Sequence, residues 1–316
     1  MTEEMNAIAM GVHVLDVLVR PVDRIPEGQG GELVEQIRVT AAGSAGGTAL
    51  VLSKLGAGVR SAGAIGTDAA GDMLRGLLEQ ANVDTSLLVR RAEVQTSASV
   101  LPIRPNGDRP AFHVVGANAT YGVDDAPWEA IAAASHLHLG GPEFMGGEAA
   151  AEILGRARAE GVVTSADVLA PGDPGLLEWI GPALPHLDHL LPNAEQVLAF
   201  TGAEDLVAGC RALVERGVCC VAASRGAEGV VIVDADSVEA VPAFAVEVVD
   251  TTGCGDAFSA GYLRGLSLGR DRREAAVLGC AAAALVAQGL GTDHGDFDLA
   301  AADAFAAATP TLEVAA

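Results

Sequence analysis

The stretch Asp250-Thr251-Thr252-Gly253-Cys254-Gly255-Asp256-Ala257-Phe258 joins two segments of different periodicity. Residues 245–249 alternate and are rich in β-branched side chains, which predicts a strand. From 257 to 268 the apolar residues recur at helical spacing, and Gly269 follows as a stop signal. The sequence therefore predicts a glycine-rich turn that leads from a strand into a helix.

Such a turn has a chemical use. A helix N-terminus offers N–H groups without intrahelical partners and about half a positive charge, and glycines let an anion approach it closely. Asp256, just inside the helix, places a carboxylate beside this anion site, which suits a general base next to a phosphoryl group. The simpler interpretation is a glycine-rich helix start capped by an aspartate.

The complete string resembles the D-T-x-G-A-G-D signature of the ribokinase-like carbohydrate kinase family, which includes ribokinases, fructokinases and adenosine kinases. The resemblance implies that Asp256 is the catalytic base and that the backbone of Gly253, Cys254 and Gly255 forms the anion hole. Cys254 stands where the family usually has alanine. Because Cys254 lies at a predicted helix N-terminus, we expect a lowered pKa for its thiol.

The resemblance extends to the segments that contact the acceptor in the family. Asp16 matches an early aspartate that binds a pair of sugar hydroxyls, although a capped turn would also explain it. The turn at 42–48 resembles G-G-x-x-x-N-x-A, which makes Gly43 and Gly47 candidate substrate contacts. Gly47 replaces the asparagine of that pattern, so one polar sugar contact is lost. Asn118 follows a hairpin and is a further candidate contact.

Two segments resemble the nucleotide side of the family's site. In the first, Asn193 and Glu195 correspond to an N-x-x-E motif that organises the water shell of Mg²⁺ and phosphate, although Gln196 occupies the final position. A helix cap followed by an acidic first turn is the alternative. The second motif, S-x-G-x-x-G, gives the candidate nucleotide contacts Ser224, Gly226 and Gly229.

The resemblance also assigns two residues of the opening stretch. Thr252 is a further candidate nucleotide contact. Together, Asp250 and Thr252 resemble a monovalent-cation site, so K⁺ joins ATP and Mg²⁺ among the expected cofactors.

Regular alternation of predicted strands and helices from 136 to 233 indicates a mostly parallel central sheet with helices on both faces. Ligands of such sheets bind at the carboxyl ends of strands, where Asp167, Asn193, Ser224 and Asp250 fall. Segments 96–103 and 111–115, joined by Pro105-Asn106-Gly107-Asp108, predict a hairpin. We expect a single domain, 1–316, with a small antiparallel β lid formed by about 16–40 and 95–118, and 272–288 as the final helix.

Composition excludes several function classes. The net charge of −23 argues against nucleic-acid or anionic-membrane partners. Lys54 is the only lysine and follows Ser53, so the sequence has no P-loop. The five cysteines show no metal-ligand spacing, and the longest apolar run is too short to cross a bilayer. With Glu3 and Glu4 where a signal peptide would be basic, we expect a cytoplasmic protein.

The sequence thus predicts an ATP-dependent kinase that phosphorylates a hydroxyl of a sugar or sugar-like acceptor. A nucleoside kinase of the same fold is the alternative enzyme, and a non-catalytic sugar or nucleotide sensor is the alternative from another class. The resemblance also leads us to expect a homodimer formed through the lid.

Overall fold

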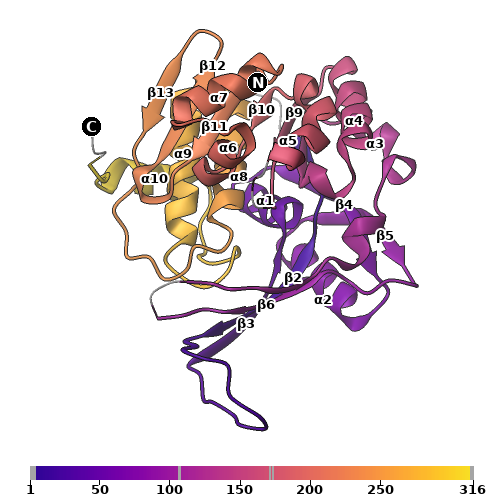
Figure 1. The fold of residues 1–316 in the computed structure, drawn as a ribbon, viewed down its shortest axis with the longest axis vertical. Coiled ribbons are helices and arrows are strands. Elements are labelled where there is room, and N and C mark those ends of the chain that lie inside the picture. The colour runs from indigo at the N-terminus through magenta and orange to yellow at the C-terminus, as the bar shows by residue number, and fades with distance from the viewer. Residues whose placement is uncertain (1–4, 106–107, 171, 173, 314–316) are drawn as a thin grey trace.

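The computed structural model describes residues 5–105, 108–170, 172 and 174–313 (Figure 1). Its main sheet has the order β13-β12-β11-β10-β9-β8-β1-β4-β5, and all pairs are parallel except β11–β12 and β12–β13. The strands are β1 Asn6–Gly11, β4 Gly58–Gly66, β5 Asp84–Arg91, β8 His136–Gly140, β9 Val163–Asp167, β10 His189–Leu190, β11 Cys220–Ser224, β12 Val230–Asp234 and β13 Val238–Val241.

Helices cover both faces of this sheet, as predicted. Strand β1 is buried on both sides, with Ala7 and Ala9 in one core and Ile8 and Met10 in the other. The first core packs under α1 Ser44–Lys54, α2 Ala69–Gln80, α8 Cys254–Ser267, α9 Arg272–Val286 and α10 Leu299–Ala308. The second core packs under α3 Trp128–Ala132, α4 Gly147–Ala159, α5 Pro174–Ile180, α6 Ala194–Thr201 and α7 Leu206–Glu215. Short 3₁₀ helices are η1 Gly116–Thr120, η2 Val123–Asp125, η3 Pro142–Phe144, η4 Gly181–His186 and η5 Gly226–Glu228.

A separate four-stranded sheet forms the lid and lies at the lower edge of the view in Figure 1. Its order is β3-β2-β6-β7, with β2 Val14–Arg20, β3 Gln36–Ala42, β6 Ala98–Pro102 and β7 Phe112–Val114. The β2–β3 and β6–β7 pairs are antiparallel, whereas the central β2–β6 pair is parallel. The predicted hairpin turn at Asn106 and Gly107 lies outside the described residues.

Two expectations about the C-terminal third were wrong. Residues 245–249 form no strand, because their backbone bonds elsewhere: Ala245 N donates to Pro310 O and Val249 N donates to Ala287 O. The helix predicted at 272–288 is not the last, since α10 follows it with Asp298 as its cap. Within the described residues, no helix combines the length and the apolar character needed to span a bilayer.

Candidate functional site

The site is organised by the turn that begins α8. Gly253 has a φ of 77°, and a Cβ there would lie 2.1 Å from Thr292 Oγ1, so only glycine fits. Asp250 fastens the turn: its Oδ1 accepts bonds from Thr252 N (3.0 Å) and Thr252 Oγ1 (2.8 Å), and its Oδ2 accepts one from Gly291 N (3.1 Å). The N–H groups of the first turn of α8 are thereby held in a fixed direction.

Asp256, in this first turn, lies directly against α1. A Cβ on Gly47 would lie 2.2 Å from Asp256 Oδ2 and 2.9 Å from its Cβ. The glycine at the family's asparagine position therefore makes room for the carboxylate. Gly43, with a φ of 84°, caps α1, and the N–H groups of Ala45 and Gly46 donate to Val12 O. The start of α1 is thus partly satisfied by the protein itself.

Carboxylates surround this point and shift one another's titration. Burial, followed by the charges of Asp167 and Asp16, raises the pKa of Asp256 well above its usual value, while Arg109 opposes the shift. Asp16 is 6% exposed, and burial raises its pKa to about 6 against the lowering effects of a Ser99 hydrogen bond and of Arg109. The floor of the site is therefore acidic, and the carboxyl groups of Asp256 and Asp16 bind protons more readily than free ones.

Arg109 is a site residue that sequence reasoning missed. It lies in the lid between β6 and β7, and its Nη1 donates to Thr252 Oγ1 at 3.4 Å, next to the start of α8. Arg109 and Thr252 are 143 residues apart in the sequence, so no local pattern around Arg109 could predict this contact. It connects the lid with the turn before α8.

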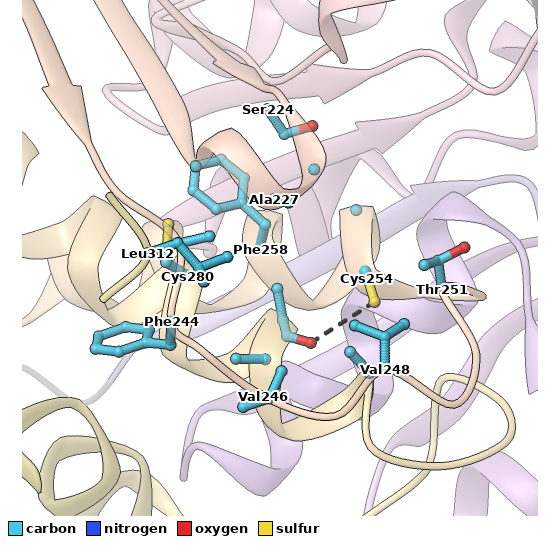
Figure 2. Close-up of a pocket in the computed structure, with 17 residues that line it drawn as sticks. Ser224, Ala227, Phe244, Val246, Val248, Thr251, Cys254, Phe258, Cys280 and Leu312 are labelled. Carbon is cyan, nitrogen blue, oxygen red and sulfur yellow. Dashed lines mark hydrogen bonds between the residues drawn. The ribbon is translucent and has the colours of Figure 1, made fainter. Parts of the chain in front are cut away.

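An apolar cavity of about 230 Å³ opens on the other side of α8 (Figure 2). Its rim includes the predicted nucleotide contacts Ser224, Gly226 and Gly229 together with Cys254 and Gly255. Its apolar wall comes from 243–248, α8, α9 and the C-terminal segment, as the side chains of Phe244, Val246, Val248, Phe258 and Leu312 show.

Our expectation for the Cys254 thiol was wrong. Burial raises the pKa of this thiol to about 12, with a further contribution from the charge of Asp250. Figure 2 shows the cause: the side chain turns towards α9, where Sγ contacts Ala283 O at 3.6 Å. Desolvation therefore outweighs the helix dipole.

Asn193 serves as the cap of α6. Its Oδ1 accepts a bond from Gln196 N (2.8 Å), and Gln196 Oε1 accepts one from Asn193 N (2.9 Å). The backbone of Asn193 pairs with that of Ser224, which brings the two predicted nucleotide segments side by side, and Glu195 is exposed next to them. The side-chain Nε2 of Gln196 also donates hydrogen bonds to Val168 O and Ala170 O.

Three other polar residues have structural contacts. The side-chain amide of Asn118 brackets the backbone of His13, accepting from its N (3.1 Å) and donating to its O (3.0 Å). Lys54 donates to the carbonyls of Asp293, His294 and Gly295 and so holds the loop behind Thr292. Asp68 caps α2 by accepting a hydrogen bond from Gly71 N.

Comparison with known proteins identifies the family of this chain. The pfkB family of carbohydrate kinases matches residues 11–297. A nucleoside kinase of Methanothermobacter thermautotrophicus is 27% identical over 92% of each chain, and an ATP-dependent ribose-1-phosphate kinase of Halopiger xanaduensis is 31% identical over 78% of this chain and 80% of its own. A putative ribokinase II from E. coli, in complex with ATP and Mg²⁺, has a TM-score of 0.84 at 20% identity and covers 95% of this chain and 98% of its own. This chain therefore belongs to the pfkB family of carbohydrate kinases and is an ATP-dependent sugar or nucleoside kinase.

Proposed function

We propose that this kinase transfers the γ-phosphoryl group of ATP to a hydroxyl of a free sugar or sugar-like acceptor, with Asp256 as the general base. The observation that carries the proposal is the Asp256 carboxylate, held against Gly47 at the junction of α1 and α8. Its raised pKa makes it a stronger proton acceptor at neutral pH than an ordinary aspartate. It takes the proton of the acceptor hydroxyl as that oxygen attacks phosphorus.

The anion hole is proposed at the start of α8. Backbone N–H groups of Gly253, Cys254 and Gly255 would stabilise the charge that develops on the transferred group. The positive φ of Gly253 and the bonds of Asp250 support this role, because they fix the turn before any ligand binds. A preformed site of this kind needs little reorganisation during the reaction.

The nucleotide is proposed to place its base in the apolar cavity and its phosphates along Ser224, Gly226 and Gly229 towards α8. Mg²⁺ in such sites keeps several waters and is held by one or two carboxylates plus phosphates, and it would neutralise phosphate charge. The exposed Glu195 beside Asn193 fits that type of binding, since the described residues contain no metal-binding cluster of three or more His, Cys, Asp or Glu.

On the acceptor side, Asp16 would hold hydroxyl groups from the lid. Its burial supports this role, because a buried carboxyl group needs hydrogen-bond donors. Arg109 would close the lid over the bound ligands by its contact with Thr252. Gly43 and Gly47 contribute space and backbone rather than side-chain contacts. Asn118 supports the site through its bracket on His13.

A free sugar suits the described site better than a nucleoside. The nucleobase of a nucleoside acceptor would need an apolar slot, and neither Tyr121 nor Phe112 supplies one. Tyr121 packs in the second core, and Phe112 is 61% exposed and pairs with the exposed Val100. The 27% identity to a nucleoside kinase nevertheless makes nucleosides the second candidate class.

We also propose a homodimer formed through the outer face of the lid. Val39, Val17, Val100 and Phe112 follow one another across four strands in a single row. Three of them are at least 36% exposed, with Ile37 at 63% beside them on β3. An apolar sheet face of this size is normally covered, and a second copy presents the same surface.

The predicted location and the predicted K⁺ site stay predictions. All five cysteines are free thiols, which fits the predicted cytoplasmic location. Both carboxylate oxygens of Asp250 already accept hydrogen bonds from the protein. We therefore propose that Asp250 anchors the turn before α8, and the proposed reaction does not depend on K⁺.

The test is a coupled assay of ADP formation with ATP and Mg²⁺ over D-ribose, D-fructose, adenosine, cytidine and their phosphorylated counterparts. We expect acceptor-dependent turnover with a free sugar, and binding of ATP by calorimetry. ATP binding without turnover of any acceptor would instead support a sensor.

A further inference from the structure

Asp167 is a buried carboxylate to which the proposed mechanism assigns no role. It ends strand β9 and is 5% exposed. Its Oδ1 has no hydrogen-bond partner among the described residues, and its Oδ2 lies 3.6 Å from His138 Nε2, beyond hydrogen-bond distance. Burying a carboxylate without donors is costly, so such a group is retained where a ligand supplies the donors.

The fold places Asp167 beside the reacting centre. It pairs in register with Gly140 of β8, and a Cβ on Gly140 would lie 2.4 Å from Ala45 N. The start of α1 therefore sits directly on the end of β8, with Asp167 on the adjacent strand. Among the charged neighbours that act on Asp256, Asp167 has a stronger effect than Asp16.

Other polar atoms near Asp167 share its lack of partners. Ser44 Oγ, at the start of α1, is 2.9 Å from the position of a Cβ on Gly140. Ser44 is 2% exposed and His138 is 1% exposed, and neither Ser44 Oγ nor His138 Nε2 has a hydrogen-bond partner within the described part of the chain. Three buried polar side chains thus gather around the end of β8 and β9, as expected for a subsite that a polar ligand completes.

We propose that Asp167 is a second acceptor-binding carboxylate, which receives a hydroxyl hydrogen bond from the main sheet while Asp16 receives one from the lid. The inference rests on the proposed kinase function and deepens it. It also restricts the acceptor: Asp16, Asp167 and Asp256 together repel a phosphate dianion, so the preferred acceptor is an unphosphorylated polyol. In this respect the chain would differ from the ribose-1-phosphate kinase that it resembles.

The wild-type protein and Asp167→Asn are compared with D-ribose, D-fructose and cytidine, and with ribose 1-phosphate and fructose 1-phosphate. Asp167→Asn keeps the shape of the side chain but removes its charge. We expect KM for the best neutral acceptor to rise about 10- to 100-fold, the scale of a charged hydrogen bond, with kcat and ATP binding changed far less. Glu178→Gln removes an equal charge from an exposed ion pair with Arg216 and serves as the matched control.

Wild-type preference for a neutral acceptor over its phosphorylated counterpart by at least about tenfold supports the inference, and this measurement does not depend on the folding of any variant. An acceptor KM of Asp167→Asn within about twofold of wild type would overturn it. Turnover of phosphorylated acceptors alone would overturn it while leaving the kinase proposal intact. Absence of turnover with every acceptor would contradict both.

Discussion

At the scale of single residues, a few charges set the titration of Asp256, the proposed general base. Asp167 and Asp16 raise the pKa of this carboxyl group, whereas Arg109 lowers it. A general base works only when it is deprotonated, so with Asp256 in this proposed role kcat/KM would fall as the pH drops through its pKa. Arg109 would then extend activity to lower pH.

Replacing Arg109 by glutamine tests this relation. Loss of the positive charge raises the pKa of Asp256, so the acidic limb of the profile of kcat/KM against pH should move to higher pH. The profile is measured for the acceptor at saturating ATP. Arg104→Gln, an exposed arginine of the same lid segment, is the control and should leave the limb in place. A limb that stays put or moves to lower pH in Arg109→Gln would contradict this description of the site.

At this scale the sequence was informative where a motif is local. Gly253, Gly255 and Asp256 lie in one turn, and Ser224, Gly226 and Gly229 lie in another, so each group could be assigned from the resemblance of one short motif to the kinase family. Arg109 and the subsite around Asp167 depend on contacts between distant strands and helices, which no local spacing encodes. For Cys254 the direction of the pKa shift depends on the side-chain rotamer, which the sequence does not give: the thiol turns towards α9 and is buried there.

At the scale of elements, the contact between α1 and α8 positions Asp256, the proposed base. Gly47 is the point of closest approach, because three atoms of the Asp256 side chain lie within 2.9 Å of where its Cβ would be. One of them is the Cβ of Asp256, so a rotation of the carboxylate alone cannot relieve the clash. An alanine at this position would push the two helices apart.

We therefore expect Gly47→Ala to reduce kcat by at least about tenfold, since a shift of about 1 Å at a catalytic group can cost 100-fold. Helix propensity acts in the opposite direction, because alanine is favoured over glycine inside a helix by about 0.5–1 kcal/mol. Thermal denaturation, measured beside the kinetics, separates the two effects. Gly46→Ala is the matched control: the atom nearest to its new Cβ would be His13 Cδ2 at 3.4 Å, an ordinary contact. Equal kcat values in the two variants would show that the clash at Gly47 does not matter.

Element prediction failed where backbone partners lie far away in the sequence. The alternation of 245–249 is real, but Val246 and Val248 face the cavity and the backbone bonds to 287 and 310 instead of a strand. Strand β5 and helix α10 were not predicted. Strand β5 lies at the edge of the described sheet, where it pairs with β4. Helix α10 is rich in alanine, so its apolar and polar faces differ little in sequence. By contrast, the capping box of α6 lies within four consecutive residues, and the helix cap at Asn193 was foreseen as the alternative interpretation of that segment.

At the scale of the whole molecule, the doubly covered sheet follows from the regular alternation of apolar strands and helices, which is why it could be predicted. The lid could be predicted as extra strands, but its parallel β2–β6 pair could not, since β3, α1, β4, α2 and β5 all lie between these two strands in the sequence. The outer face of the same lid carries the row of apolar side chains that we propose as the dimer interface.

Val100→Asp tests that assignment, because Val100 lies in the middle of the row between Val17 and Phe112. A charge there would be buried at the interface, so light scattering should give the mass of a dimer for wild type and of a monomer for the variant. Val238→Asp, at a similarly exposed valine on β13, should remain a dimer. A wild-type monomer, or a dimer that survives Val100→Asp, would remove the lid from the interface.

The central claim is that Asp256 is the general base, and Asp256→Asn tests it most directly. Asparagine keeps the shape of the side chain but cannot accept a proton at neutral pH, and loss of a general base typically costs about 10²–10⁴ in rate. Because phosphoryl transfer can be loose, with late proton transfer, the lower end of this range is included. The measurement is kcat with the best acceptor, together with calorimetric binding of ATP and acceptor to the variant. We predict at least about a 100-fold loss of kcat with both ligands still bound; a kcat within about threefold of wild type would contradict the account.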